Sequence, residues 1–136
     1  KEKLAFGYRT SVIREKGYLV LGAELMLVPG EKEEILARMQ ELKRRRVEKQ
    51  PLEYPSAGSA FKRPEGYFAG KLVQDAGLSG YAVGGAKVSE KHCGFLINAG
   101  NATASDVMEL IRQIQAKVKE QFGVQLEPEI QFLGNF

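Results

Sequence analysis

The strongest constraint on the fold is an amphipathic helix predicted near the C-terminus, between Thr103 and Gly123. Its apolar side chains recur every three or four residues, so they form one stripe along the helix. Such a stripe has to be buried against another layer of structure. We expect Thr103 or Ser105 to cap the start of this helix and Gly123 to end it. The stripe consists of Val107, Leu110, Ile111, Ile114, Val118 and Phe122.

The partner layer is expected to be a small sheet, because short apolar segments separated by glycine-rich turns lie upstream of this helix. A longer apolar run, Tyr18–Val28, is predicted to be a buried strand that ends at a Pro-Gly turn. The fold class is therefore α+β, a small mixed sheet covered by amphipathic helices. The other predicted elements are helices over 31–49 and 68–76 and strands over 81–83, 86–89, 95–99 and 124–133.

Composition narrows the class of protein. With 136 residues the chain has the size of one domain and a net charge of only +3, which fits an anionic small molecule as well as nucleic acid. No apolar run approaches the roughly 20 residues that span a bilayer. Its single cysteine excludes an internal disulfide. These features predict a cytoplasmic protein that does not contact a membrane.

The segment Tyr54–Pro64 is the best candidate for a functional site. Two prolines bracket a run of small residues, which argues against a helix or a central strand. Gly58 permits a backbone geometry closed to other residues and lets a ligand approach the hydroxyl of Ser59. The alternative is a Pro/Gly linker with incidental hydroxyl groups.

Two basic features each have two interpretations. Arg9 follows a predicted bend at Gly7, where a guanidinium forms a bidentate clamp on a carboxylate or phosphate, or is simply solvated at a strand edge. The run Lys43–Arg46 complements the C-terminal end of the helix dipole, or else contacts nucleic acid. We favour the helix end for this run, because no aromatic residues are interleaved with it.

The adjacent pair His92 and Cys93 does not form a metal or nucleophilic site by sequence criteria. The chain has no other histidine or cysteine, whereas a zinc site needs three or four ligands. Neighbouring residues on a strand point to opposite faces, which argues against a Cys–His pair. Cys93 is expected to be a packing residue, and His92 to be at most a polar wall of a pocket.

Taken together, the motifs resemble the UDP-N-acetylenolpyruvoylglucosamine reductase (MurB) family, in the order and spacing of that family and over essentially the whole chain. The motifs are Gly7-Tyr8-Arg9-Thr10-Ser11, Pro55-Ser56-Ala57-Gly58-Ser59-Ala60-Phe61-Lys62-Arg63-Pro64, Ala69-Gly70-Lys71-Leu72, Ala76-Gly77-Leu78-Ser79-Gly80, Gly84-Gly85-Ala86-Lys87-Val88-Ser89, Phe95-Leu96-Ile97-Asn98 and Leu126-Glu127-Pro128-Glu129-Ile130.

The resemblance implies an NADPH-dependent, FAD-mediated oxidoreductase of peptidoglycan precursor synthesis, and hence a role in cell-wall biogenesis, cell shape and cell division. Its substrate would be UDP-N-acetylglucosamine enolpyruvate and its product UDP-N-acetylmuramate. The chain resembles the shorter, second type of the family, since it lacks a long tyrosine-bearing insertion. Residues 1–48 would be the C-terminal end of the FAD-binding domain, with the strand at Tyr18–Val28, and residues 49–136 the substrate-binding domain.

The resemblance also assigns roles to individual residues. Arg9, Ser59 and Glu129 are expected to be catalytic, with Ser59 as the proton donor, and no metal is expected. We expect the substrate-binding residues to be Tyr8, Lys62 and Arg63.

Two expectations concern the chain as a whole. The chain is expected to be a portion of a longer flavoenzyme whose N-terminal region contains most of the FAD-binding domain. Alone, it should be inactive and should not retain FAD. The alternative function is a non-catalytic basic α+β binding module, for which oligonucleotide affinity would fall steeply with salt.

Overall fold

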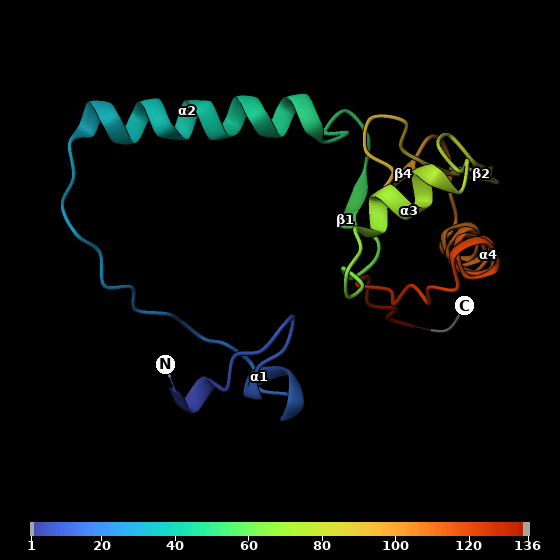
Figure 1. Cartoon of the computed structure of the whole chain (residues 1–136). Coiled ribbons are helices and arrows are strands. Elements are labelled where there is room, and N and C mark those ends of the chain that lie inside the picture. The colour runs from blue at the N-terminus through green and yellow to red at the C-terminus, as the bar shows by residue number, and fades with distance from the viewer. Residues whose placement is uncertain (1, 135–136) are drawn as a thin grey trace. The chain divides into compact units, whose positions relative to one another are not determined.

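The computed structural model describes residues 2–134, and its contacts divide the chain into two units, Lys1–Ile35 and Leu36–Phe136. Every predicted helix is present, and Gly80 and Gly84 have the positive φ angles expected of tight turns. In chain order the elements in Figure 1 are η1 (Glu2–Leu4), α1 (Val12–Glu15), α2 (Lys32–Lys49), β1 (Ser56–Ser59), α3 (Ala69–Asp75), β2 (Ala82–Val83), β3 (Ala86–Val88), β4 (Phe95–Asn98) and α4 (Ala104–Phe122).

The second unit is built on a four-stranded sheet with the strand order β1-β4-β3-β2. Every pairing in it is antiparallel, with Val83 opposite Ala86 in the β2–β3 hairpin and Val88 opposite Leu96 between β3 and β4. Alternate residues of β3 and β4 therefore point to the same face, where they join the hydrophobic core with α3 and α4. The expected α+β fold is confirmed.

Helix α4 supplies the largest share of the helical side of this core. Leu110, Ile111, Ile114 and Val118 are all buried, as the apolar stripe predicts. Phe122, the last member of the stripe, is 38% exposed because it lies at the final turn. The predicted caps are confirmed. Thr103 and Asp106 form a capping box, and the C-cap Gly123 has a φ of 68°.

Within the candidate segment Tyr54–Pro64, the residues Ser56–Ser59 form an edge strand, β1, which is neither a helix nor a central strand. An edge position tolerates the flanking prolines, because one side of the strand needs no ladder partner. The predicted last strand, 124–133, is wrong as a regular strand. Only Pro128 pairs, in an isolated antiparallel bridge with Phe61, since a proline nitrogen cannot donate the hydrogen bond that would extend the ladder.

The predicted strand at Tyr18–Val28 is also not formed. The segment has no regular secondary structure, and Leu21 and Met26 are 98% and 100% exposed. A strand needs a neighbour to satisfy its backbone groups, and none of the described residues pairs with this segment. Among the described residues of the first unit, this segment therefore has no strand partner.

Helix α2 forms as predicted, but its apolar stripe is not buried. The stripe residues are each about half exposed, with Met39 at 61%, and the helix has no buried residue. A helix with an uncovered apolar stripe lacks the tertiary packing that normally stabilises it. The stripe consists of Ile35, Leu36, Met39, Leu42 and Val47.

Candidate functional site

Two of the predicted catalytic residues, Ser59 and Glu129, lie on segments that are hydrogen-bonded to each other. Ser59 is the last residue of β1, and the backbone N–H of Glu129 donates to the carbonyl of Ala60, the next residue, at 2.9 Å. A second backbone bond, from the N–H of Lys62 to the carbonyl of Glu127 at 2.8 Å, continues this pairing. Residues about 70 positions apart along the chain are thus joined by main-chain hydrogen bonds.

The hydroxyl of Ser59 lies at an accessible point of this pairing. Ser59 is exposed, and its Oγ donates to the carbonyl of Phe61 at 3.3 Å, a long and weak contact. Gly58 has a φ of 89°, in the region that favours glycine, and a Cβ placed on it would meet nothing within 4 Å. Open space therefore adjoins the serine.

The two basic residues after Ser59 are both engaged by neighbours. Lys62 forms an ion pair with Glu127, so part of its charge is already compensated. The guanidinium of Arg63 lies 4.0 Å from the centre of the Phe68 ring, and its Nε donates to the carbonyl of Tyr67 at 3.2 Å. These contacts tie Lys62 to the segment of Glu127 and Arg63 to the turn before α3.

Arg9 and Tyr8 lie in the first unit. A bridge between Gly7 and Thr10 forms the predicted bend, and Arg9 at its tip has a φ of 56°, unusual for a residue with a side chain. The guanidinium lies 5.7 Å from the centre of the Tyr8 ring. The structure thus places these two residues together, but in a different unit from Ser59 and Glu129.

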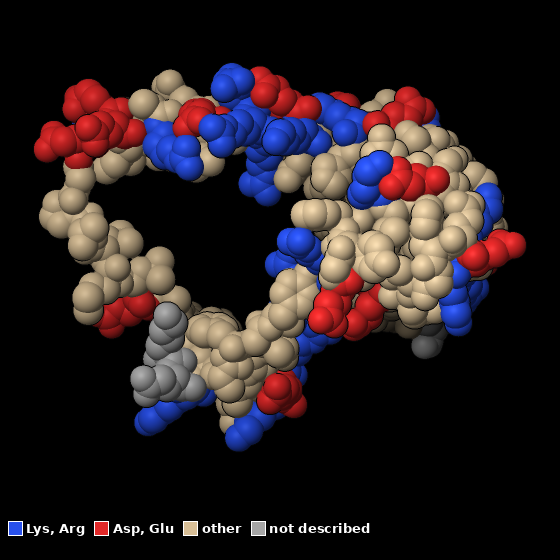
Figure 2. All heavy atoms as spheres, in the orientation of Figure 1, with Lys and Arg blue, Asp and Glu red and all other residues tan. Residues whose placement is uncertain are grey.

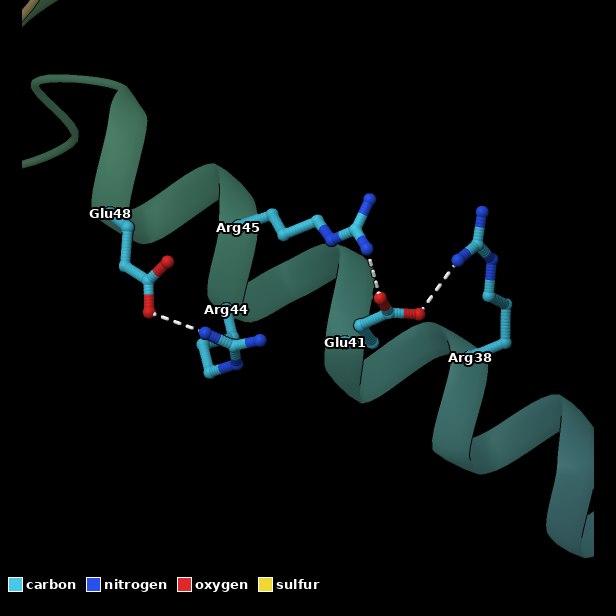
Figure 3. Close-up of polar contacts among 5 residues, drawn as sticks. All are labelled: Arg38, Glu41, Arg44, Arg45 and Glu48. Atoms are coloured by element: carbon cyan, nitrogen blue, oxygen red, sulfur yellow. Dashed lines mark hydrogen bonds and ion pairs between the residues drawn. The ribbon is translucent and has the colours of Figure 1, made fainter.

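Two members of the basic run Lys43–Arg46, together with Arg38, pair with carboxylates of the same helix α2. Arg38 and Arg45 both bind Glu41, the former at 2.6 Å, and Figure 3 shows these contacts together with a second pair. In that second pair Arg44 binds Glu48 at 2.8 Å. Figure 2 shows acidic side chains interspersed with the basic ones along this helix. This pattern fits a solvated helix face better than a nucleic-acid surface.

A cavity of about 460 Å³ lies elsewhere in the second unit, and neither Ser59 nor Glu129 lines it. Two ion pairs occupy its wall. Lys87 lies 2.8 Å from Glu90, and Lys91 lies 3.5 Å from Glu53. The hydrogen bond and charge of Glu90 raise the pKa of Lys87 above its ordinary value. Because the charged side chains of these two ion pairs neutralise each other, this cavity is not a candidate site for an ionic ligand.

Other classes of site receive no support from the described residues. Within residues 2–134, no three or more histidine, cysteine, aspartate or glutamate side chains gather where they could hold a metal ion. No helix in that range combines the length and apolar character needed to cross a bilayer. Cys93 is buried, as expected of a packing residue. His92, expected to be at most a polar wall of a pocket, packs its imidazole against Phe95, the cross-strand partner of Ser59. Its only sequence signal is that no other histidine exists.

Comparison with known proteins identifies relatives over the whole chain. The family model described as "UDP-N-acetylenolpyruvoylglucosamine reductase, C-terminal domain" matches residues 50–133. Curated proteins named UDP-N-acetylenolpyruvoylglucosamine reductase are similar to it in sequence. The one from Agathobacter rectalis is 60% identical over 136 residues, 100% of this chain and 43% of that protein. The one from Lachnoclostridium phytofermentans is 60% identical over 134 residues, 98% of this chain and 43% of that protein.

A solved structure is similar as well. It is the UDP-N-acetylenolpyruvylglucosamine reductase (MurB) from Thermus caldophilus, with a TM-score of 0.73 and 41% sequence identity. The match covers 96% of this chain and 46% of that chain. The chain therefore spans less than half the length of these relatives.

Proposed function

Because this chain belongs to the UDP-N-acetylenolpyruvoylglucosamine reductase family, we propose that it supplies the substrate-binding part of such an enzyme. The reaction is the NADPH-dependent, FAD-mediated reduction of UDP-N-acetylglucosamine enolpyruvate to UDP-N-acetylmuramate, a step of peptidoglycan precursor synthesis in the cytoplasm. The observation that carries the proposal is the main-chain pairing that joins the strand of Ser59 to the segment of Glu129.

The proposed role of Ser59 is to deliver a proton. The flavin, when bound, supplies the hydride that adds to C3 of the enolpyruvyl double bond. C2 then takes a proton from the Ser59 hydroxyl, and water returns a proton to the serine oxygen. A serine hydroxyl is a weak acid, so positive charge near the developing alkoxide lowers the barrier, and Lys62 is the nearest candidate along the strand.

Arg9 and Glu129 are proposed to handle the charge that develops next to C2. Electron density moves towards the substrate carboxylate, which a guanidinium such as that of Arg9 stabilises by a bidentate contact. Glu129 would repel that carboxylate if it were ionised and unpaired. We therefore propose that Glu129 helps to polarise the enolate, either in its protonated form or while paired with Arg9. It is half-buried, which favours such sharing over full solvation.

The remaining proposed contacts concern the nucleotide. Lys62 and Arg63 follow Ser59 directly, and their cationic groups suit the diphosphate of a UDP-sugar. The aromatic hydroxyl of Tyr8, beside Arg9 in the first unit, offers a further hydrogen bond to the substrate.

The surroundings of Ser59 fit a flat cofactor. The open space over Gly58 gives a planar ring access to the backbone beside the proton donor, and the strand there lies at the sheet edge. The hydroxyl of Ser59 and the carboxyl of Glu129, in the roles proposed above, act on the enolpyruvyl group rather than on the flavin ring. The residues therefore fit a flavin that another part of the protein brings to this edge.

The proposed partner is the flavin-binding region of the same enzyme, with residues 1–48 as its C-terminal end and residues 49–136 as the substrate domain. Two features support it. The Tyr18–Val28 segment exposes apolar side chains without a strand partner, and the apolar stripe of α2 is uncovered. Lys43 lies on the stripe side of α2, four residues after Met39 and seven after Leu36, so the partner surface should carry acidic groups.

A hybrid enzyme tests the proposed function. This chain would replace the matching 43% of the Agathobacter rectalis reductase, to which it is 60% identical. The hybrid should bind FAD and oxidise NADPH in multiple turnovers that depend on the enolpyruvyl substrate, while a hybrid carrying Ser59→Ala should turn over far more slowly. A folded, flavin-loaded hybrid that never responds to that substrate would disprove the proposal.

A further inference from the structure

His92 is held in one orientation by its own turn. The backbone N–H of Gly94 donates to its Nδ1 at 3.1 Å, and its ring meets the ring of Phe95 edge-on, with 5.0 Å between centroids. The backbone N–H of His92 in turn donates to the hydroxyl of Ser89 at 3.3 Å. Both the ring and the main chain of this histidine are therefore fixed, although the residue is exposed.

The imidazole of His92 packs against two glycines, Gly94 and Gly70, which form its packing site. A Cβ on Gly94 would lie 2.9 Å from Cε1 of His92, and a Cβ on Gly70, in the first turn of α3, would lie 3.3 Å from the same atom. The first distance is too short for real atoms, and the second is tighter than usual. The side of the ring formed by Nδ1 and Cε1 is thus packed closely against the backbone of both glycines, where an added Cβ would push the imidazole aside.

Gly94 also connects this packing site to the strand of Ser59. The carbonyl of Gly94 accepts a hydrogen bond from the N–H of Ala60 at 2.8 Å. Phe95, whose ring touches the imidazole, is the cross-strand partner of Ser59. Directly opposite residues of an antiparallel pair point to the same face of a sheet, so the Phe95 ring and the serine hydroxyl share a face.

The contact with Gly94 also determines where the ring carries its hydrogen. Because an N–H group donates to Nδ1, this nitrogen acts as an acceptor, and the neutral imidazole then carries its hydrogen on Nε2. Among residues 2–134, none accepts a hydrogen bond from that Nε2. A donor is therefore fixed in direction and left available to a ligand.

We propose that His92 donates this Nε2 hydrogen to an anionic oxygen of the substrate and so positions the enolpyruvyl group against Ser59. The inference rests on the proposed function. The substrate offers two oxygens of this kind, those of its diphosphate and those of its enolpyruvyl carboxylate. A neutral donor suits either, since Lys62 and Arg63 already bring positive charge to this strand.

Two variants of the hybrid enzyme separate this role from a structural one. His92→Asn keeps an acceptor near Gly94 and removes the outward donor, whereas His92→Gln places an amide N–H near the position of Nε2. A hydrogen bond to a charged group corresponds to a loss of about ten- to a hundredfold when removed. We expect KM for the enolpyruvyl substrate to rise by that factor in His92→Asn and by less than about threefold in His92→Gln.

Flavin reduction by NADPH, and KM for NADPH, should be unchanged in both variants. UDP alone, used as a competing ligand, separates the two oxygens. If His92→Asn weakens UDP binding by the same factor, the diphosphate is the acceptor, and if UDP binding is unchanged, the carboxylate is. Equal losses in both variants, or no loss in either, would overturn the inference while leaving an active enzyme. A wild-type hybrid without substrate-dependent activity would overturn the proposed function and the inference with it.

A spectroscopic readout does not depend on turnover. Since the 136-residue chain contains one histidine, selective ¹⁵N labelling gives a single imidazole to follow by NMR. We expect the neutral imidazole to carry its hydrogen on Nε2. A hydrogen on Nδ1 would contradict the contact on which the inference is built.

Discussion

Gly58 and Gly85 show two different reasons for a glycine in this chain. Gly58 has a φ of 89° with open space around it, so an added Cβ costs only backbone strain. At Gly85 an added Cβ would lie 2.1 Å from the carbonyl oxygen of Gly100 and 2.4 Å from the nitrogen of Ala102. That overlap with backbone cannot be relieved by a side-chain movement.

These two glycines give the first prediction. Gly58→Ala should lower the free energy of unfolding by about 1–2 kcal/mol. Gly85→Ala should lower it by about 3 kcal/mol or more, because two backbone segments must move apart. Urea denaturation of the chain followed by circular dichroism measures both. An equal loss, or the reverse order, would show that the turn before β3 is looser than described.

Asp106 gives a pH-dependent prediction. Hydrogen bonds from the backbone N–H and then the hydroxyl of Thr103 hold the pKa of this carboxyl below its ordinary value of 3.8. A carboxyl with a lowered pKa in the folded state stabilises the protein above its ordinary pKa, and this contribution is lost as the pH falls through the lowered value. The stabilisation should therefore be complete near neutral pH.

The variant Asp106→Asn cannot ionise and should melt below the wild type near neutral pH. The gap between the two melting midpoints should close as the pH is taken progressively below 3.8. Thermal melts over a pH series measure it. A gap that stays constant down to strongly acidic pH would show that the capping box does not depend on the carboxylate charge.

The sequence predicts the role of a single residue correctly where that role depends only on residues close by in the chain. The roles of Thr103 and Gly123 as caps depend on residues three or four positions away, so the sequence was sufficient. The packing site of His92 was not predictable, because Gly70, which packs against its imidazole, lies far away in the sequence on α3. The ion pair between Lys62 and Glu127 joins segments 65 residues apart for the same reason.

At the scale of elements, α2 has two different faces. One carries the ion pairs of Figure 3, centred on Glu41 and Glu48. The other carries the apolar stripe, together with Arg46, whose Nε donates to Gln50 at 3.1 Å. Charged pairs of the first kind contribute little individually, whereas burial of the stripe would contribute far more. We therefore expect the second face to decide how α2 packs in a complete enzyme.

The third prediction compares one substitution on each face of α2. Met39→Glu should leave the 136-residue chain unaffected, because Met39 is 61% exposed there. In the hybrid enzyme it should cost about 2 kcal/mol or more, since a carboxylate would enter an apolar contact. Arg44→Ala, on the other face, should cost less than about 0.5 kcal/mol in both. Thermal melts of the four variants, each compared with its own wild type, measure this, and equal effects of Met39→Glu in both settings would refute it.

The misplaced elements have a common physical cause. Apolar patterning at Tyr18–Val28 reports that the segment is suited to burial, but it does not say where the covering residues lie. In the same way, the patterning of residues 124–133 predicts a strand, yet Pro128 leaves a gap in the ladder. The helices were predicted correctly because their periodicity and caps are contained within each element.

At the scale of the whole molecule, the residues proposed to be catalytic are divided between the two units. Ser59 and Glu129 lie in the second unit, and Arg9 lies in the first. The chain also spans only 43% of the length of the Agathobacter rectalis relative. We therefore expect other parts of the enzyme to contribute to the proposed flavin site.

The fourth prediction follows from this division. The purified 136-residue chain should be colourless, should not retain FAD through gel filtration, and should not oxidise NADPH. The hybrid enzyme, purified in parallel as the control, should be yellow. A yellow preparation of the chain alone, with stoichiometric flavin in its absorption spectrum, would show that this part of the protein holds the cofactor itself.

The most direct test of the account measures the two half-reactions of the hybrid enzyme separately, with and without Ser59→Ala. Stopped-flow absorbance follows flavin reduction by NADPH and then flavin reoxidation by the enolpyruvyl substrate. General acid catalysis is worth about 10²- to 10⁴-fold, so Ser59→Ala should slow reoxidation by about that factor and leave reduction unchanged. Equal slowing of both half-reactions, or unchanged reoxidation, would contradict the assignment of Ser59 as the proton donor.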